Sequence, residues 1–316
     1  MIKNRRAFIV GIKGYNLSKK EAFFLKKYKP WGIILFSRNI KSAYQTRKLN
    51  SQIRKLFLDN KYPIFIDEEG GIVSRLSRIL LTSCFSGEYF GKKYQNEKNN
   101  FNSYVDIYIN QISFLLKNIG VNINNSPILD LRNKCSDIVI GNRAFSVNKK
   151  IVSQIGKIFI KKFHDNKIAT VIKHIPGHGL AKVDSHKKTP IVTQNLKYLI
   201  DNDFFPFKNQ KSLFAMTAHI IFKSIDKNFT VTHSKKAISI IRNIIKFKHL
   251  IITDDISMKS LKFSISENTV KAFNAGCNLV LHCNAKMNEM KKVAENSPRI
   301  DNFIMKKTLE FYKLID

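Results

Sequence analysis

The sequence predicts one α/β domain, a single (β/α)8 barrel of the TIM type, over residues 1–316. Two observations favour this fold class. Short apolar runs alternate with amphipathic, lysine-rich segments along the chain, and strands that alternate with helices form parallel sheets. Eight such units in about 300 residues match the usual size of a (β/α)8 barrel. A doubly wound parallel sheet is the alternative, because periodicity alone does not distinguish the two.

The predicted strands are short apolar runs bounded by polar or turn-forming residues. Strands of a parallel barrel are buried on both faces, so they appear as nearly continuous apolar runs and not as alternating ones. The eight runs comprise residues 7–12, 32–36, 63–67, 121–130, 169–173, 213–219, 250–254 and 277–282.

Amphipathic segments between these runs predict the helices. Ser18 and Glu21 have the spacing of a capping box, which opens the first helix. The further predicted helices span residues 42–60, 102–118, 147–166, 195–210, 234–247, 266–275, 286–296 and 301–314.

The net charge of +32 admits two interpretations. A strongly basic chain suits a nucleic-acid partner or an anionic surface. However, the lysines are scattered through the predicted helices without a long basic block, and arginine, the preferred residue for phosphate recognition, is scarce. Heavy use of Lys, Asn, Ile and Phe indicates AT-rich codons. We therefore expect a compositional origin for the charge and no nucleic-acid partner.

Targeting features favour a cytoplasmic protein. No apolar run approaches the roughly 20 residues of a membrane span, so no membrane association is expected. The N-terminus lacks a small-residue cleavage site, which argues against a signal peptide.

Cys277 and Cys283 flank one predicted strand, which separates them by about 20 Å and excludes a disulfide between them. The four cysteines, the other two being Cys84 and Cys135, are expected to be reduced thiols.

Polar side chains gather at the carboxyl ends of the predicted strands, where a barrel builds its active site. A single such residue is often only a helix cap, but polar residues occur at the carboxyl ends of six predicted strands. The loop 173–186, with the sequence KHIPGHGLAKVDSH, is the richest of these ends, because Pro and Gly forbid regular structure while three histidines are placed in it. The candidate functional residues are Asp67, His174, His178, Asp184, His186, Asp254 and Asp255.

Two chemistries fit these residues. In a metal-dependent hydrolase the histidines and carboxylates are ligands, but barrel metallohydrolases usually place an H-x-H pair on the first strand, and residues 7–12 contain no histidine. In a metal-free mechanism, a carboxylate attacks and a histidine transfers the proton. The sequence favours the second and predicts neither a metal nor a cofactor.

The loop also carries a family resemblance. KHIPGHGLAKVDSH resembles the K-H-F-P-G-H-G-x(4)-D-S-H signature of the β-N-acetylhexosaminidase branch of family-3 glycoside hydrolases. The resemblance extends over nearly the whole chain, because GIILFSRNI, FIDEEGGIVSRL, VIGNRAFS, MTAHIIF, TDDISM and AGCNLVLHCN are similar to further motifs of that family. It implies a (β/α)8-like barrel and a retaining hydrolysis of terminal β-linked N-acetylglucosamine.

The resemblance implies a role for individual residues. Asp254 matches the nucleophile that forms a covalent glycosyl-enzyme, His186 matches the acid/base, and Asp184 matches the partner of that histidine. A histidine suits the acid role, since its pKa lies near neutrality and neighbouring carboxylates favour imidazolium. His178 matches a position that shapes the loop. The positions that match sugar-binding residues are Asp67, Arg75, Arg143, Lys173 and His174.

The chain departs from the family pattern at a few positions. Ile72 stands where an arginine is usual, which is expected to remove a polar group near the sugar pocket. Asn142 and Asn278 stand where the family often has aspartate, and the segment 77–93 is expected to be a remodelled loop.

Cytoplasmic members of this branch act in peptidoglycan recycling, where they release N-acetylglucosamine from anhydro-muropeptides. The resemblance therefore implies that role, a small-molecule amino-sugar substrate and a monomeric enzyme. Phosphorolysis to a sugar 1-phosphate is an alternative with the same residues, because a histidine acid/base tolerates an anionic acceptor. A nucleic-acid-binding protein on a degenerate barrel is the alternative of a different class.

Overall fold

Eight parallel strands close into a barrel in the computed structural model, in the order β1-β10-β9-β7-β5-β4-β3-β2. The structure describes residues 2–133, 140–185 and 187–316. All eight strands lie within or overlap the predicted apolar runs, so the predicted (β/α)8 barrel is confirmed. The barrel strands are β1 (Arg6–Gly11), β2 (Pro30–Leu35), β3 (Ile64–Ile66), β4 (Ile123–Asn124), β5 (Ala169–Ile175), β7 (Phe214–Thr217), β9 (Leu250–Asp255) and β10 (Leu279–His282).

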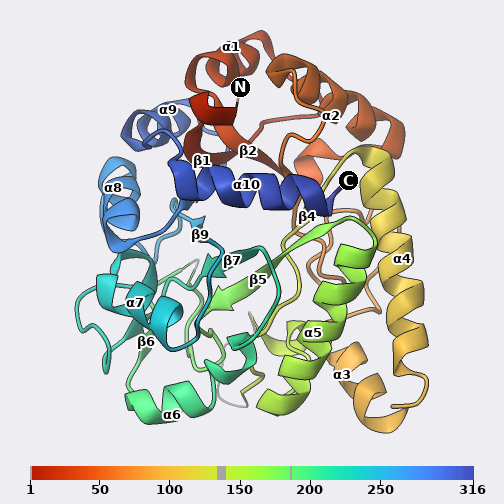
Figure 1. The fold of residues 1–316 in the computed structure, drawn as a ribbon, viewed down its shortest axis with the longest axis vertical. Helices are drawn as coiled ribbons and strands as arrows, with labels where there is room; N and C mark the ends of the chain where they lie inside the picture. Colours follow the sequence, from red (N-terminus) through yellow and green to blue (C-terminus); the bar gives the residue numbers. More distant parts are fainter. Residues whose placement is uncertain (1, 134–139, 186) are drawn as a thin grey trace.

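Helices surround the barrel (Figure 1). A small separate sheet pairs β6 (Ile191–Val192) with β8 (Ile221–Phe222). The predicted capping box opens α1, with Ser18 accepting from the Glu21 backbone and the Glu21 side chain accepting from Ser18. The helices are α1 (Lys19–Tyr28), α2 (Ala43–Phe57), α3 (Gly87–Asn96), α4 (Phe101–Ile119), α5 (Lys149–Asp165), α6 (Leu196–Asp201), α7 (Lys235–Asn243), α8 (Ile265–Ala275), α9 (Met287–Asn296) and α10 (Asn302–Leu314).

The barrel interior is filled by apolar side chains and closed at one end by α10. Trp31, Phe65 and Phe214 are fully buried there and stack edge-on or tilted against one another. Phe311 of α10 packs on the same cluster, and the Trp31 indole N–H donates to Thr308 on that helix at 2.9 Å. Figure 1 shows α10 crossing in front of the barrel. This packing covers the amino-terminal end of the strands and leaves the carboxyl ends for the site.

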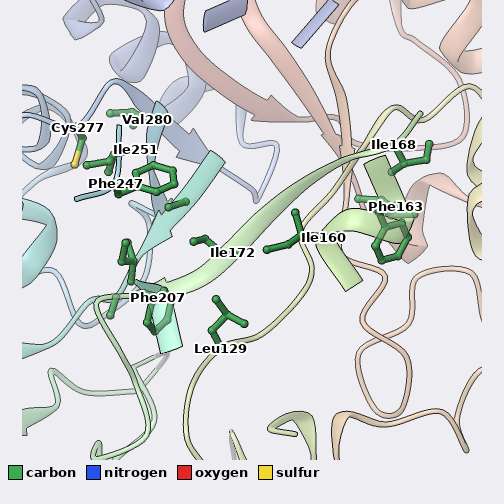
Figure 2. Packing of buried hydrophobic residues seen from close by; sticks show 14 of the residues in the cluster. Leu129, Ile160, Phe163, Ile168, Ile172, Phe207, Phe247, Ile251, Cys277 and Val280 are labelled. Atoms are coloured by element: carbon green, nitrogen blue, oxygen red, sulfur yellow. The ribbon is translucent and has the colours of Figure 1, made fainter. Parts of the chain in front are cut away.

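A second apolar layer holds the helices on the outside of the barrel. Figure 2 shows Ile172 of β5 beside Leu129 and Ile160, which belong to the same buried cluster. Outward-facing strand residues of this kind alternate with the residues that fill the interior, as the two-residue period of a strand requires. The β5 strand is therefore buried on both faces, and only its carboxyl end reaches the site.

Three predicted elements differ from the structure. The fourth strand was expected over residues 121–130, but β4 covers only Ile123–Asn124, because Pro127 has no N–H to donate to a ladder. The helix expected at 195–210 ends at Asp201, and a short 3-10 turn, Phe205–Phe207, follows it around Pro206. The segment 77–93 was expected to be a loop, yet α3 begins at Gly87 with Ser86 as its N-cap.

Two further predictions concern membranes and thiols. No helix in the described part of the chain is both long and apolar enough to cross a membrane. Cys84, Cys277 and Cys283 are free, as expected, whereas Cys135 lies outside the described residues. Burial raises the pKa of the Cys277 thiol to about 12. That thiol is therefore protonated and has the low reactivity typical of a structural cysteine.

Candidate active site

A pocket of about 140 Å³ opens at the carboxyl ends of the strands. It is lined by seven of the nine residues for which the family resemblance implied a role. Among these seven residues, Asp67 and Asp254 are the most distant pair, 187 positions apart in the sequence. The pocket is lined by Asp67, Glu69, Val73, Arg75, Ile140, Arg143, Lys173, His174, His178, Ser185, Met216, Asp254, Leu281 and Cys283.

Charged side chains of the pocket lining form one connected network, called here the charged wall. Lys173 donates to Asp67 at 3.2 Å and to Glu69 at 2.6 Å. Glu69 also accepts two hydrogen bonds from Arg143, each 2.9 Å long. Asp67 in turn accepts from the Asn125 amide at 3.0 Å. Glu69 and Lys173 are almost completely buried, so the pairing offsets a large desolvation cost.

The electrostatics of this wall keep every member charged. Burial opposes ionisation of Asp67, but the charges of Lys173 and Arg75 outweigh it and hold the pKa of Asp67 below its usual value. Burial likewise opposes ionisation of Glu69, whose pKa is lowered by Arg143 and Lys173. The pKa of Lys173 is raised against its burial by Asp67 and Glu69. The wall is thus a set of fixed charges suited to binding hydroxyl groups.

Asp130 organises the histidine loop from beneath. Its carboxylate is fully buried and accepts from the backbone N–H of His174, at 3.1 and 3.2 Å, and of His178 at 2.7 Å. The His174 Nδ1–H also donates to it at 2.7 Å. This contact fixes the orientation and tautomer of the His174 ring at the pocket.

His178 is held in the loop as a neutral residue. It is 3% exposed, its Nε2 lies 3.3 Å from the Ser185 hydroxyl, and burial together with the nearby His174 lowers its pKa to about 4. These contacts agree with the expected role of shaping the loop.

Asp254 and Asp255 end β9 and have different surroundings. Asp254 lines the pocket, and one of its carboxylate oxygens accepts from the Asp255 backbone N–H at 2.7 Å. The Asp255 side chain instead accepts from the backbone and hydroxyl of Ser257, at 3.0 and 2.8 Å, and from the Cys283 N–H at 3.2 Å. Asp255 is therefore a cap that ties β9 to β10, and of the two only Asp254 is directed to the pocket.

The loop after β3 presents Arg75, and a buried carboxylate shapes it. Glu68 accepts from the backbone N–H groups of Arg75 and Leu76 and from the hydroxyls of Ser74 and Thr82, at 2.8 to 3.1 Å. Arg75 reaches Asp67 at 3.5 Å. Its side chain is 29% exposed, and both Arg75 and Asp67 line the pocket, so this ion pair belongs to the pocket and not to the outer surface.

Ile72, at which the loss of a polar group near the sugar pocket was expected, does not itself line the pocket. The residue is 67% exposed at the tip of the turn made by Gly70 and Gly71, and its neighbour Val73 lines the pocket in its place. The two other departures from the family pattern are Asn278 and Asn142. Asn278 accepts from Arg242 at 2.7 Å and from the Ile251 N–H at 2.9 Å, and Asn142 lies in the short turn Gly141–Arg143.

The proposed acid/base pair belongs to the loop after β5. Asp184 is partly buried, and its backbone carbonyl accepts from the N–H groups of Lys187 and Lys188, at 2.9 and 3.0 Å. Its chain neighbour Ser185 lines the pocket. His186 lies outside the described residues. No group of three or more histidine, cysteine, aspartate or glutamate side chains is arranged to hold a metal ion within residues 2–133, 140–185 and 187–316.

Comparison with known proteins decides the family. The sequence profile described as "Glycosyl hydrolase family 3 N terminal domain" matches residues 5–307. The beta-hexosaminidase of Actinobacillus pleuropneumoniae serotype 3 is 30% identical over 288 residues, which cover 87% of this chain and 80% of that protein. The chain belongs to glycosyl hydrolase family 3. It is therefore a glycosidase.

Other family-3 proteins agree in sequence and fold. The beta-hexosaminidase of Haemophilus influenzae is 29% identical over 306 residues, covering 92% of this chain and 85% of that protein. The crystal structure of native NagZ from Neisseria gonorrhoeae superposes with a TM-score of 0.85 at 25% identity, covering 99% of this chain and 90% of that one.

Sequence reasoning missed two residues of this family-3 site. Glu69 was visible only as the third acid of the D-E-E run, and Asp130 only as a polar residue near a strand end. Neither sequence position shows whether the carboxylate is buried against charged residues of the pocket or caps a helix at the surface. Only the structure shows that Glu69 holds Arg143 and Lys173, and that Asp130 holds His174.

Proposed function

We propose that this glycosidase is a retaining exo-β-N-acetylglucosaminidase that removes a terminal, non-reducing β-linked N-acetylglucosamine. The observation that carries the proposal is a small pocket lined both by Asp254 and by the paired charges of Asp67, Lys173 and Arg143. The relatives that are about 30% identical are named beta-hexosaminidases, which supports the same class of substrate.

The proposed reaction has two steps. In the first, the Asp254 carboxylate attacks the anomeric carbon while His186, oriented by Asp184, gives a proton to the leaving oxygen. The bond to the leaving group breaks and a glycosyl ester with Asp254 forms. In the second, His186 takes a proton from water, the water oxygen attacks the same carbon, and Asp254 leaves as a carboxylate. Two inversions retain the β configuration.

The charged wall is proposed to hold the sugar ring. Asp67 and His174 present acceptors, and Lys173, Arg75 and Arg143 present donors, so neighbouring hydroxyl groups find charged partners on both sides. The members already pair with one another, and hence they need little reorganisation when the sugar binds. Such fixed positioning lowers the barrier to attack by Asp254.

We further propose anhydro-muropeptides as the natural substrate, in the cytoplasmic recycling of peptidoglycan, with the chain acting as a monomer. The pocket, of about 140 Å³, supports this because its small size suits a single terminal sugar. No nucleic-acid partner is proposed, and the positive charge is attributed to composition. Retention on DNA that falls steeply with salt would contradict that statement.

The test is hydrolysis of 4-nitrophenyl β-N-acetylglucosaminide by the wild type and by Asp254→Ala and His186→Ala. The wild type is expected to turn over, and each variant to lose at least about 100-fold in kcat. Release of N-acetylglucosamine from β-N-acetylglucosaminyl anhydromuramic acid, followed by mass spectrometry, tests the natural substrate. A folded wild type that hydrolyses neither compound would exclude the proposed function.

Buffer and chelator identify the chemistry. Turnover that is unchanged by a chelator is expected, and loss of activity that added metal restores would favour the metal-dependent alternative. Reaction in phosphate buffer is expected to yield free N-acetylglucosamine. If the sugar 1-phosphate accumulates there, the enzyme is a phosphorylase with the same residues.

A further inference from the structure

His219 and two threonines form a buried hydrogen-bonded chain next to the pocket. His219 follows β7 and is 1% exposed, while Thr217 and Thr232 are fully buried. The Thr217 and Thr232 hydroxyls are 2.8 Å apart, and the Thr232 hydroxyl lies 2.7 Å from His219 Nδ1. The other ring nitrogen, Nε2, lies 3.1 Å from the backbone carbonyl of Asp255. The proposed sugar-binding and catalytic roles use none of these three side chains.

The contacts determine where each proton lies. A carbonyl oxygen only accepts, so His219 Nε2 must carry a proton and donate it to Asp255. Burial lowers the pKa of His219, although Asp254 and Asp255 oppose the shift, and the ring is therefore neutral at pH 7. A neutral ring has no proton on Nδ1, which consequently accepts from the Thr232 hydroxyl. Since each hydroxyl has one proton, Thr232 in turn accepts from Thr217.

This chain ends on the residue that also contacts Asp254. The Asp255 N–H donates to the Asp254 carboxylate at 2.7 Å, while the Asp255 carbonyl accepts from His219. The Asp255 side chain is held by Ser257 and by the Cys283 N–H. Asp255 is thus anchored through its side chain and its carbonyl, and the donor that it aims at Asp254 cannot move unless one anchor yields.

We propose that His219 is a positioning residue for Asp254. It acts as a neutral imidazole with Nε2 protonated: Thr232 orients the ring, and the ring holds the Asp255 backbone that contacts Asp254. The inference rests on the proposed nucleophilic role of Asp254. It assigns to the M-T-A-H segment a task that substrate contact does not explain. His219 itself does not touch the reacting atoms. Its contribution is to keep one carboxylate oxygen of Asp254 bound to the Asp255 N–H, so that the other oxygen keeps a fixed orientation in the pocket.

The experiment compares His219→Leu, His219→Gln and Thr232→Val with the wild type. The matched control is His164→Gln. His164 of α5 is partly buried and also pairs with a threonine, with Nε2 3.1 Å from the buried Thr170 hydroxyl, near the start of β5 and away from the pocket. The measurements are kcat and KM for 4-nitrophenyl β-N-acetylglucosaminide, the Kd for N-acetylglucosamine, and Tm.

A positioning role predicts a loss in kcat without a loss in sugar binding. His219→Leu is expected to lower kcat about 100-fold, the effect of a misplacement near 1 Å, with KM and the Kd for N-acetylglucosamine changed less than about 3-fold. His219→Gln keeps a donor within reach of the Asp255 carbonyl and is expected to recover about 10-fold of that loss. Thr232→Val is expected to lower kcat about 10-fold, and His164→Gln to leave kcat unchanged.

Three outcomes overturn the inference. One is a folded His219→Leu variant whose kcat stays within about 3-fold of the wild type. Another is an equal loss in kcat and in sugar affinity, which would indicate a general disturbance of the pocket. The third is no recovery with glutamine. If the leucine variant does not fold, Thr232→Val decides by the same criteria. A folded wild type that hydrolyses no β-N-acetylglucosaminide excludes the proposed N-acetylglucosaminidase function and the inference with it, whereas an active wild type with unaffected variants excludes only the inference.

Discussion

Glu69 and Arg143 are joined by two hydrogen bonds of 2.9 Å, one from Nε and one from Nη2 of the guanidinium. Lys173 donates to the same carboxylate at 2.6 Å. One buried anion therefore fixes two cations of the pocket wall, although 74 positions separate Glu69 from Arg143 in the sequence. This relationship gives the most direct test of how the wall is maintained.

Replacement of Glu69 by glutamine is expected to damage both stability and activity. The change leaves Arg143 and Lys173 buried without their shared anion, and breaking a buried ion pair costs about 3–5 kcal/mol. We expect the free energy of unfolding, measured with denaturant, to fall by about 3 kcal/mol and kcat/KM to fall about 100-fold. The control is Glu88→Gln, which removes an ion pair of a more exposed side chain on α3 and is expected to cost under 1 kcal/mol. Equal effects of the two substitutions would contradict the special role of Glu69.

Asp130→Asn tests how the histidine loop is held. Asparagine keeps one acceptor oxygen but replaces the other by a donor, so it cannot accept from the His174 ring and from both backbone N–H groups together. We expect kcat/KM to fall 10- to 100-fold through misplacement of His174, with a smaller loss in Tm. Asp226→Asn is a matched control, because Asp226 also accepts from two backbone N–H groups and a hydroxyl, but in a loop after β8. Wild-type kinetics for Asp130→Asn would refute this account.

Gly87→Ala tests whether α3 supports Arg143. A Cβ at Gly87 would lie 2.0 Å from the Arg143 carbonyl oxygen, so the backbone that carries Arg143 must move. We expect kcat/KM to fall about 10- to 100-fold and Tm to fall by several degrees. Gly14→Ala is the control, since nothing lies within 4 Å of a Cβ there. An alanine at Gly87 with full activity would mean that the helix and the Arg143 segment are not coupled.

Ile72→Arg restores the residue that is usual in the family. Because Ile72 is 67% exposed and does not line the pocket, an arginine there has room in solvent and no required contact with the sugar ring. We expect kcat/KM for 4-nitrophenyl β-N-acetylglucosaminide to change less than about 3-fold, as is usual for surface substitutions. An increase above 10-fold would show that this position does reach the bound substrate.

Asp203 predicts a pH-dependent stability. Burial and the nearby Asp130 raise the pKa of Asp203 from 3.8 to about 7. The unfolded chain releases this proton above pH 4 whereas the folded protein keeps it until about pH 7, so the wild type loses stability as the pH rises between these values. Asp203→Asn removes the loss, and its stability relative to the wild type is expected to increase over the same interval by at most about 4 kcal/mol.

The measurement for Asp203 is the free energy of unfolding at pH 4, 5.5, 7 and 8 for both proteins. The difference should grow from pH 4 to 7 and then stay constant. Asp201→Asn, an exposed position two residues earlier, is expected to show no such trend. A difference between Asp203→Asn and the wild type that is independent of pH would contradict the raised pKa.

Local patterns in the sequence were sufficient for the eight strands, whereas the choice of a barrel over a doubly wound sheet also depended on the family resemblance. Strands such as β5 and β9 are buried on both faces, so their apolar runs are visible without any knowledge of their neighbours. The capping box at Ser18 also depends only on residues three positions apart. Elements were misjudged where a proline interrupts the run, as at Pro127 and Pro206, or where a helix such as α3 follows an irregular segment.

The sequence by itself determined the eight strands and the polar residues at their carboxyl ends, and its family motifs indicated seven of the residues that line the pocket. Only the tertiary structure decided which charge pairs with which. Closure of the barrel places Glu69 against Arg143, Asp130 against His174, and His219 against the Asp255 carbonyl. Strand formation depends on a local run of apolar residues, whereas a hydrogen bond between residues distant in the sequence depends on the register of the closed sheet. That register is a property of the whole barrel and cannot be recognised in any one segment.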